Sequence, residues 1–174
     1  MSNKKIILFT ISFFIYVLFQ VIFLKNLVMF NVAFCYLYVA FLLSLPIETP
    51  KVYLLVAAFV LGLSVDIFYD TLGIHAAACT LIAYLRPFWI KLLKPRTDYE
   101  SDSEPAVREM GLTWYILYAF PLLVIHHLLF FIIEASGLQQ FWDLLAKTVA
   151  TAVFTLFVIV IIQYLFYMQP KRRF

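Results

Sequence analysis

Residues 61–75, LGLSVDIFYDTLGIH, decide the fold, because they join two apolar runs through a short polar turn. The stretch places two aspartates, two glycines and a histidine in or beside those runs. Charged side chains inside a membrane are costly and usually face protein or water. The acids therefore indicate either a functional site or a polar contact between packed helices.

The composition indicates an integral membrane protein. Of the 174 residues, 65% are hydrophobic and 13% are charged, and the mean hydropathy is +0.97. A soluble domain is about 45–50% apolar and about 25% charged. We expect one all-α transmembrane domain over residues 1–174, because too few residues lie outside the apolar runs for a separate soluble domain. Cys35 and Cys79 lie inside apolar segments and are expected to be packing residues rather than a disulfide.

A helix crosses the roughly 30 Å hydrocarbon layer in about 20 residues. On this basis the chain predicts a bundle of six transmembrane helices. No small-residue cleavage site follows the first apolar run, so it is expected to remain as a helix. The six expected spans cover about residues 6–24, 32–47, 52–69, 75–93, 112–133 and 144–168.

The second span, residues 32–47, is the shortest and ends near Pro46 and Pro50. It cannot be merged with the first span, because Lys25, Asn26 and Asn31 interrupt the apolar run. A five-span alternative, in which residues 32–47 re-enter the membrane instead of crossing it, stays open. Spans three and four are expected to form a tight hairpin whose turn is residues 70–73, with Asp70 or Thr71 capping the following helix.

Basic residues predict the orientation, since cytoplasmic loops carry an excess of Lys and Arg. Six spans with the N-terminus inside leave only Lys25 and Lys147 on the outer side. Arg86 then lies in the inner half of the fourth span. Both termini are therefore expected in the cytoplasm. The basic residues assigned to the inner side are Lys4, Lys5, Lys51, Lys91, Lys94, Arg96, Arg108, Lys171, Arg172 and Arg173.

The one sizeable polar segment is the predicted inner loop, residues 94–111. It has almost no large apolar residues, so it is expected to be a flexible connector that cannot form a core. Contact with a cytoplasmic partner is the functional alternative. The basic residues 171–173 are expected to anchor the C-terminus near anionic lipid.

The small and polar residues of the predicted hairpin lie on one face of each of its two helices. Residues four apart on a helix share a face. Small residues on one of these faces would let another helix approach closely. In the third span this face comprises Ala58, Gly62, Asp66 and Asp70, and in the fourth span it comprises His75, Cys79, Ala83 and Arg86.

The rise of a helix restricts which of these residues can pair. Arg86 lies eleven residues after His75, so it is about 16 Å deeper at 1.5 Å per residue. An Asp66–Arg86 pair is therefore not expected, and Asp70 with His75 across the turn is easier. Asp66 is expected to meet the polar ends of other helices or one of His126, His127 and Glu134. The adjacent histidines diverge on a helix, so at most one of them is expected to face any given site.

No set of residues in the chain has the spacing of a known catalytic motif. The histidine pair lacks the HExxH pattern of a metalloprotease, and the four glycines form no phosphate-binding loop. Asp66 and Asp70 lack the glycine and arginine that flank them in membrane phosphotransferases. We therefore predict a protein that is not an enzyme and that binds no cofactor, metal or nucleic acid.

The hairpin residues resemble the signature of the MreD family of rod-shape-determining membrane proteins. The resemblance rests on Gly62, Asp66, Leu72, Gly73, His75 and Ala76, in the pattern G-x3-D, a short turn, then L-G-x-H-A. The small size, six spans and inside termini agree with it. The specific letters cover about fifteen residues, and the acidic inner loop is not a family feature.

The resemblance implies a non-enzymatic scaffold of the elongation machinery in the bacterial cytoplasmic membrane. It would bind the transmembrane helix of MreC, and through MreC it would be linked to MreB, RodA and RodA's partner transpeptidase. It would thereby support rod shape and lateral peptidoglycan synthesis. The family is also similar in fold to the substrate-binding subunits of energy-coupling-factor transporters. It supplies no catalytic residues, so Gly62, Asp66, Asp70, Gly73, His75 and Arg86 are candidates for motif or partner-interface roles.

Two other functions stay open at this stage. A vitamin-binding subunit of an energy-coupling-factor transporter would share the size and the number of spans. Its coupling subunit would dock on small residues at the inner side, whereas the alanines at 76–78 lie at the outer end of the fourth span. An enzyme acting on lipid-linked wall precursors would need Asp66 or His75 for turnover.

Overall fold

The structure is a computed structural model that describes residues 3–93, 103–135 and 141–167. Within these residues the chain folds into five long helices. Long apolar runs produce them, and each run ends at a turn residue or a polar loop. Shorter elements connect them: η1 (Gln20–Leu24), β1 (Val28–Met29), β2 (Ala33–Phe34), α2 (Val39–Ser44) and α5 (Val107–Met110). The long helices are α1 (Asn3–Phe19), α3 (Lys51–Tyr69), α4 (Ile74–Leu92), α6 (Leu112–Glu134) and α7 (Phe141–Tyr167).

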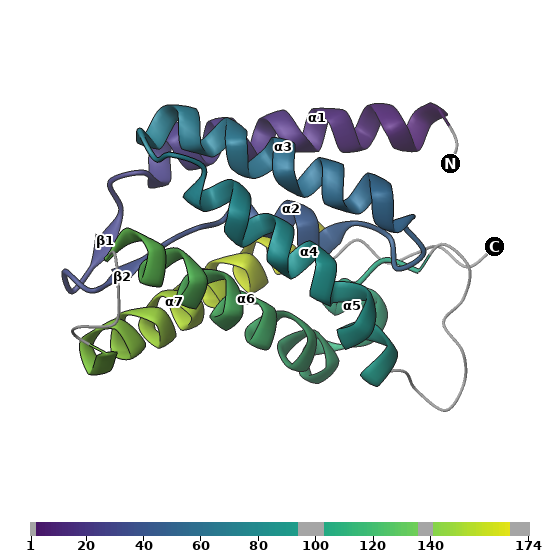
Figure 1. The fold of residues 1–174 in the computed structure, drawn as a ribbon. Coiled ribbons are helices and arrows are strands. Elements are labelled where there is room, and N and C mark those ends of the chain that lie inside the picture. The colour runs from purple at the N-terminus through teal and green to yellow at the C-terminus, as the bar shows by residue number, and fades with distance from the viewer. Residues whose placement is uncertain (1–2, 94–102, 136–140, 168–174) are drawn as a thin grey trace.

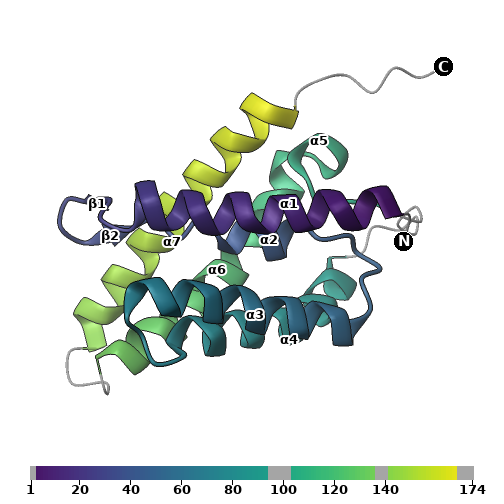
Figure 2. The same ribbon diagram turned by 90° about the horizontal axis from the view of Figure 1, so that it is seen from above.

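The helices pack as two antiparallel pairs that share an interface. α3 packs along α4, α4 packs on α6, and α6 packs on α7 (Figure 1). α1 runs along α3 and covers the short helix α2. Figure 2 shows α1 crossing over α2 while the later part of α7 extends away from the other helices. The end of the bundle that contains the turn at residues 70–73 is called the hairpin end below.

Four helices in the described part of the chain are long and apolar enough to cross a membrane. Their outward faces are lined by large apolar side chains, as expected for helices in contact with lipid. α4 equals α3 in length but carries His75, Arg86 and Lys91 and is not among the four. The chain is thus a helical membrane protein. The four segments are Ile6–Leu24, Lys51–Tyr69, Leu112–Glu134 and Phe141–Phe166.

The expectation of a helix over residues 32–47 is wrong. This stretch contains β2, which pairs with β1 in a two-residue antiparallel ladder, then a short irregular passage with a turn and the six-residue helix α2. It is nevertheless buried in the centre of the bundle: Tyr38, Val39 and Leu43 are fully enclosed. Apolar character here reflects burial in protein rather than a spanning helix, and hydropathy alone does not separate the two.

Other elements supply the hydrogen bonds that a helix over 32–47 would have made internally. The backbone N–H groups of Phe34 and Tyr36 donate to the hydroxyls of Thr151 and Thr155 on α7, at 3.3 and 3.1 Å. The N–H of Tyr38 donates to the side-chain oxygen of Gln20 at 3.3 Å. Irregular backbone at membrane depth is tolerated only where protein satisfies it. These contacts explain how an irregular segment can occupy the core.

The first span continues beyond α1 through the π-helical turn η1, which begins at Gln20. The amide of this fully buried residue also donates to the carbonyl of Cys35, at 2.9 Å, and to the hydroxyl of Tyr69, at 2.8 Å. A π-helical turn widens the helix locally and often marks a special position. Here it occurs where the first helix binds both α3 and residues 32–47, which are called the central segment below.

Part of the predicted inner loop packs on the bundle, against expectation. Val107 is buried, and its N–H donates to the side-chain oxygen of Gln163 on α7 at 2.8 Å. The N–H of Ile47 donates to the carbonyl of Ser103 at 3.1 Å. Residues 103–111 are therefore held against α6 and α7. Residues 94–102 and 171–173, which carry the other predictions for polar segments, lie outside the described residues.

Candidate functional site

The turn between α3 and α4 is closed by backbone geometry that the sequence motif permits. Asp70 ends α3 in the left-handed conformation, with φ of 56°, and its N–H donates to the carbonyl of Asp66. Gly73 has φ of 85°, a value that glycine adopts without the strain a Cβ would add. The carbonyl of Gly73 then accepts from the N–H of Ala77 at 2.9 Å, which starts α4. The predicted tight hairpin is confirmed.

Asp66 caps α4 from within α3. Its two carboxylate oxygens accept from the backbone N–H groups of His75 and Ala76, at 3.0 and 2.9 Å, and the Thr71 hydroxyl donates to one of them. The first N–H groups of a helix lack partners inside the helix and favour negative charge. The 2% exposed carboxylate satisfies two of them. The prediction that Asp70 or Thr71 caps α4 is wrong. Of the partners expected for Asp66, the structure shows the polar end of another helix, α4, rather than His126, His127 or Glu134.

Gly62 allows the two helices of the hairpin to touch. A Cβ at this position would lie 2.4 Å from the Cα of Ala76 and 2.5 Å from the carbonyl oxygen of His75. No side chain fits at such distances without moving the α4 backbone. The predicted narrow face at Ala58 and Gly62 is confirmed, because both are buried in α3.

His75 turns into the core instead of toward Asp70. Its Nδ1 lies 2.7 Å from the hydroxyl of Tyr38, and the ring is fully buried. Asp70, in its left-handed cap position, is exposed. The predicted Asp70–His75 pair is thus replaced by a bond from α4 to the central segment.

A cluster of histidines continues from Tyr38. The hydroxyl of Tyr38 also lies 3.0 Å from Nε2 of His126, and the Nδ1 atoms of His126 and His127 are 3.0 Å apart. Cys79, a free thiol, lies 3.7 Å from Nε2 of His126. The expectation that at most one of the adjacent histidines faces any given site is wrong, because Nδ1, the ring nitrogen nearer the backbone, lets the neighbouring rings meet. Cys35 is also a free, buried thiol, so both cysteines are packing residues, as predicted.

Arg86 belongs to a separate cluster toward the opposite end of α4. Its Nε donates to the hydroxyl of Tyr118 at 2.6 Å, and its guanidinium also donates to the carbonyl of Leu45. The hydroxyl of Tyr118 in turn donates to the carbonyl of Leu43 at 3.0 Å. Arg86 is only 2% exposed. As predicted, it does not pair with Asp66; it binds the end of α2.

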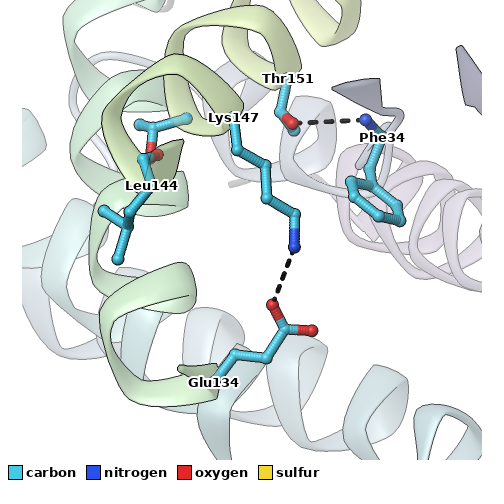
Figure 3. A network of polar contacts seen from close by, with 6 residues as sticks. Phe34, Glu134, Leu144, Lys147 and Thr151 are labelled. Carbon is cyan, nitrogen blue, oxygen red and sulfur yellow. Dashed lines mark hydrogen bonds and ion pairs between the residues drawn. The ribbon is translucent and has the colours of Figure 1, made fainter. Parts of the chain in front are cut away.

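A further polar contact at the hairpin end joins α6 and α7. Lys147 forms an ion pair with Glu134 at 3.3 Å, and its ammonium lies 4.4 Å from the ring centre of Phe131 and 4.9 Å from that of Phe34 (Figure 3). The same view shows the bond from Phe34 to Thr151 on the neighbouring turn of α7. A partly exposed pair of this kind contributes at most about 1 kcal/mol, so it supports the α6–α7 contact without being essential to the fold.

The predicted site residues are therefore divided between structural tasks. Gly62, Asp66, Asp70 and Gly73 shape the hairpin, His75 joins the histidine cluster, and Arg86 holds the end of α2. The most important polar residues that sequence reasoning missed are Gln20, Tyr38, Tyr118, Thr151 and Thr155. The threonine spacing on α7 is a signal that could have been read, because Thr148, Thr151 and Thr155 repeat at helical intervals.

Across the described ranges, no group of three or more His, Cys, Asp or Glu side chains could hold a metal ion. Asp66 makes three hydrogen bonds to neighbours in its own hairpin, so its oxygens are engaged in structure. In the comparisons with known proteins, no family model, no curated protein and no solved structure matches the chain.

Proposed function

We propose that the chain is a non-enzymatic membrane scaffold of the MreD type, which binds MreC and supports lateral peptidoglycan synthesis in a bacterial cytoplasmic membrane. The proposal starts from the resemblance of residues 62–76 to the MreD signature. One structural observation supports it: the polar and small residues of that signature are used inside the fold. Asp66, Gly62 and Gly73 build the hairpin and His75 bonds to Tyr38, which favours a rigid supporting structure over a reactive site.

Leu72 is the signature residue that the fold does not use. It lies at the tip of the turn, and its side chain is fully exposed. Within the turn at residues 70–73, Leu72 is thus an exposed apolar side chain on a hydrogen-bonded turn. We propose Leu72 as the contact with MreC on this face of the hairpin; MreB, RodA and RodA's transpeptidase would be linked through MreC.

The topology that we propose has six crossings with both termini in the cytoplasm. Five crossings are the long helices, and the sixth is the buried segment from Lys25 to Pro50. It begins near the hairpin end, where Lys25 donates to the carbonyl of Phe68, and reaches the Arg86 cluster through Leu45. This proposal keeps the predicted even number of crossings, although the second one is irregular. The similarity in fold to the substrate-binding subunits of energy-coupling-factor transporters is proposed on the resemblance alone.

Co-purification tests the function directly. The tagged chain would be co-expressed with MreC from the same genome and purified in mild detergent. We expect MreC to be recovered with the wild-type chain and at least tenfold less with Leu72→Ser. Leu92→Ser is the matched control, because Leu92 is a 74% exposed leucine at the other end of the same hairpin. Absence of MreC from the wild-type preparation, or its recovery with vitamin-transporter ATPase subunits instead, would contradict the proposal.

A further inference from the structure

Four side chains form a continuous hydrogen-bonded chain in the middle of the bundle. His75 on α4 contacts Tyr38 of the central segment at 2.7 Å, Tyr38 contacts His126 on α6 at 3.0 Å, and His126 contacts His127 at 3.0 Å. All four side chains are fully buried. Because an unpaired buried charge is strongly disfavoured, the three rings are neutral.

If the Tyr38 hydroxyl donates to one of its two histidine neighbours, counting hydrogens leaves two arrangements of the hydrogen-bonded chain. A neutral histidine carries one N–H and one bare nitrogen, and a tyrosine hydroxyl has one hydrogen to donate. If Tyr38 donates to Nδ1 of His75, Nε2–H of His126 donates to the Tyr38 oxygen and Nδ1–H of His127 donates to His126. If Nδ1–H of His75 donates to Tyr38, every bond in the chain reverses. Where Tyr38 donates to one of these rings, any mixture leaves two donors or two lone pairs facing each other at hydrogen-bond distance. Tyr38 also reaches the thiol of Cys79, but sulfur is a weak acceptor, so donation to a ring nitrogen is preferred.

The two terminal ring nitrogens of the hydrogen-bonded chain differ in protonation in both arrangements: one carries hydrogen and the other does not. Nε2 of His75 and Nε2 of His127 are buried and have no hydrogen-bond partner. In the first arrangement His75 ends in an N–H and His127 ends in a lone pair. In the second arrangement the two are exchanged. In either arrangement the hydrogen-bonded chain therefore offers one buried donor and one buried acceptor, at opposite ends.

We propose that His75, Tyr38, His126 and His127 form a two-state proton-order switch that connects the α3–α4 hairpin to α6. Reversal from the first arrangement to the second moves one proton along each of the three bonds toward His75. One proton enters at Nε2 of His127 from a donor such as water, and one leaves Nε2 of His75 to an acceptor of the same class. The number of protons on the chain is unchanged, and no backbone movement is needed.

The surroundings favour two ordered states over free exchange with solvent. The ring of His75 lies 4.5 Å from that of Phe130 and 5.5 Å from that of Tyr36, while Tyr36 also lies 5.4 Å from His127. Cys79 is the neighbouring thiol at His126, and the nearby Asp66 carboxylate is occupied by the α4 N-terminus. A hydrogen-bonding group that reaches one end of the chain would fix the tautomer at the other end. The proposal is independent of the MreD-type function.

Nitrogen NMR of the full-length protein, labelled in histidine and held in lipid nanodiscs, tests this switch. The protein has three histidines in total, so their signals can be assigned by single substitutions. We expect His75 and His126 to carry hydrogen on the same-named nitrogen and His127 on the other one. Where both arrangements are populated, their ratio should be equal at all three rings. Any other combination of tautomers, or unequal ratios, would overturn the switch.

Two matched variants test whether the Tyr38 hydroxyl is the group that couples the tautomers of His75 and His126. Tyr38→Phe removes the hydroxyl that joins His75 to His126, so the tautomers of these two rings should become independent while His126 and His127 stay linked. Tyr36→Phe removes a hydroxyl beside the same rings but outside the chain, and it should keep the wild-type pattern. Continued linkage of His75 to His126 in a folded Tyr38→Phe protein would contradict the proposal. The wild-type and Tyr36→Phe spectra decide the question even if Tyr38→Phe does not fold.

Discussion

The Asp66 cap and the histidine chain are both buried polar clusters, they are adjacent at His75, and they differ in how completely their groups are satisfied. Asp66 meets three donors, two of them backbone N–H groups of α4. The histidine chain leaves the Nε2 atoms of His75 and His127 unpaired. A fully satisfied cluster fixes one structure, whereas a partly satisfied one permits alternatives. The hairpin is therefore held in one structure, whereas the hydrogen bonds of the histidine chain beside it can adopt more than one arrangement.

The largest effect is expected from removing the cap. Asp66→Leu leaves the buried N–H groups of His75 and Ala76 without partners, and each unsatisfied donor costs about 1–3 kcal/mol. We expect a loss of about 3 kcal/mol in the free energy of unfolding, or failure to accumulate in the membrane. Thermal unfolding in detergent measures it. Asp70→Ala, at the exposed end of α3, is the control, and an equal loss there would refute the capping role.

Gly62→Val should come next, because its side chain would collide with the α4 backbone rather than with a flexible side chain. Overpacking of this kind typically costs about 1–3 kcal/mol. Thermal unfolding should show the loss, and a cysteine cross-link between α3 and α4 should form more slowly as the helices separate. Leu63→Ala, at an exposed neighbouring position, should change little. Full stability of Gly62→Val would mean that α3 and α4 do not approach this closely.

Tyr118→Phe probes the second buried cluster, where a charge rather than a helix end needs partners. The change removes the acceptor of Arg86 Nε and the donor to the Leu43 carbonyl. We expect a loss of about 2 kcal/mol, since hydrogen bonds to charged groups contribute about 1.5–3 kcal/mol. Tyr84→Phe is the control, because Tyr84 is exposed on α4. Equal unfolding temperatures for the two variants would contradict the account of Arg86.

The smallest effect should come from Thr155→Val, which preserves shape but removes the acceptor of the Tyr36 N–H. One neutral hydrogen bond contributes about 1 kcal/mol. The loss should appear as faster amide exchange at residues 34–38 rather than as global unfolding. Thr10→Val is the comparison, because the Thr10 hydroxyl bonds within its own exposed helix. Unchanged exchange in Thr155→Val would mean that α7 does not hold the central segment.

How well the sequence predicted each region depended on how local its contacts are. The α3–α4 hairpin was predictable, because its apolar runs, Gly62 and Gly73 lie within one short stretch. The cap was not, since Asp66 lies well before Ile74, while capping residues normally adjoin their helix. The segment 32–47 was misread because it is apolar for burial, and its partners Thr151 and Thr155 are 117 and 119 residues away from Phe34 and Tyr36.

Amide hydrogen exchange at His75 and Ala76 tests most directly the claim that Asp66 serves structure. In the wild-type protein both amides should exchange slowly, because the carboxylate binds them at 3.0 and 2.9 Å. In Asp66→Ala they should exchange about tenfold faster for each 1.4 kcal/mol of lost protection, while Asp70→Ala leaves them slow. Rapid exchange of these amides in the wild-type protein, or unchanged rates in Asp66→Ala, would contradict the claim.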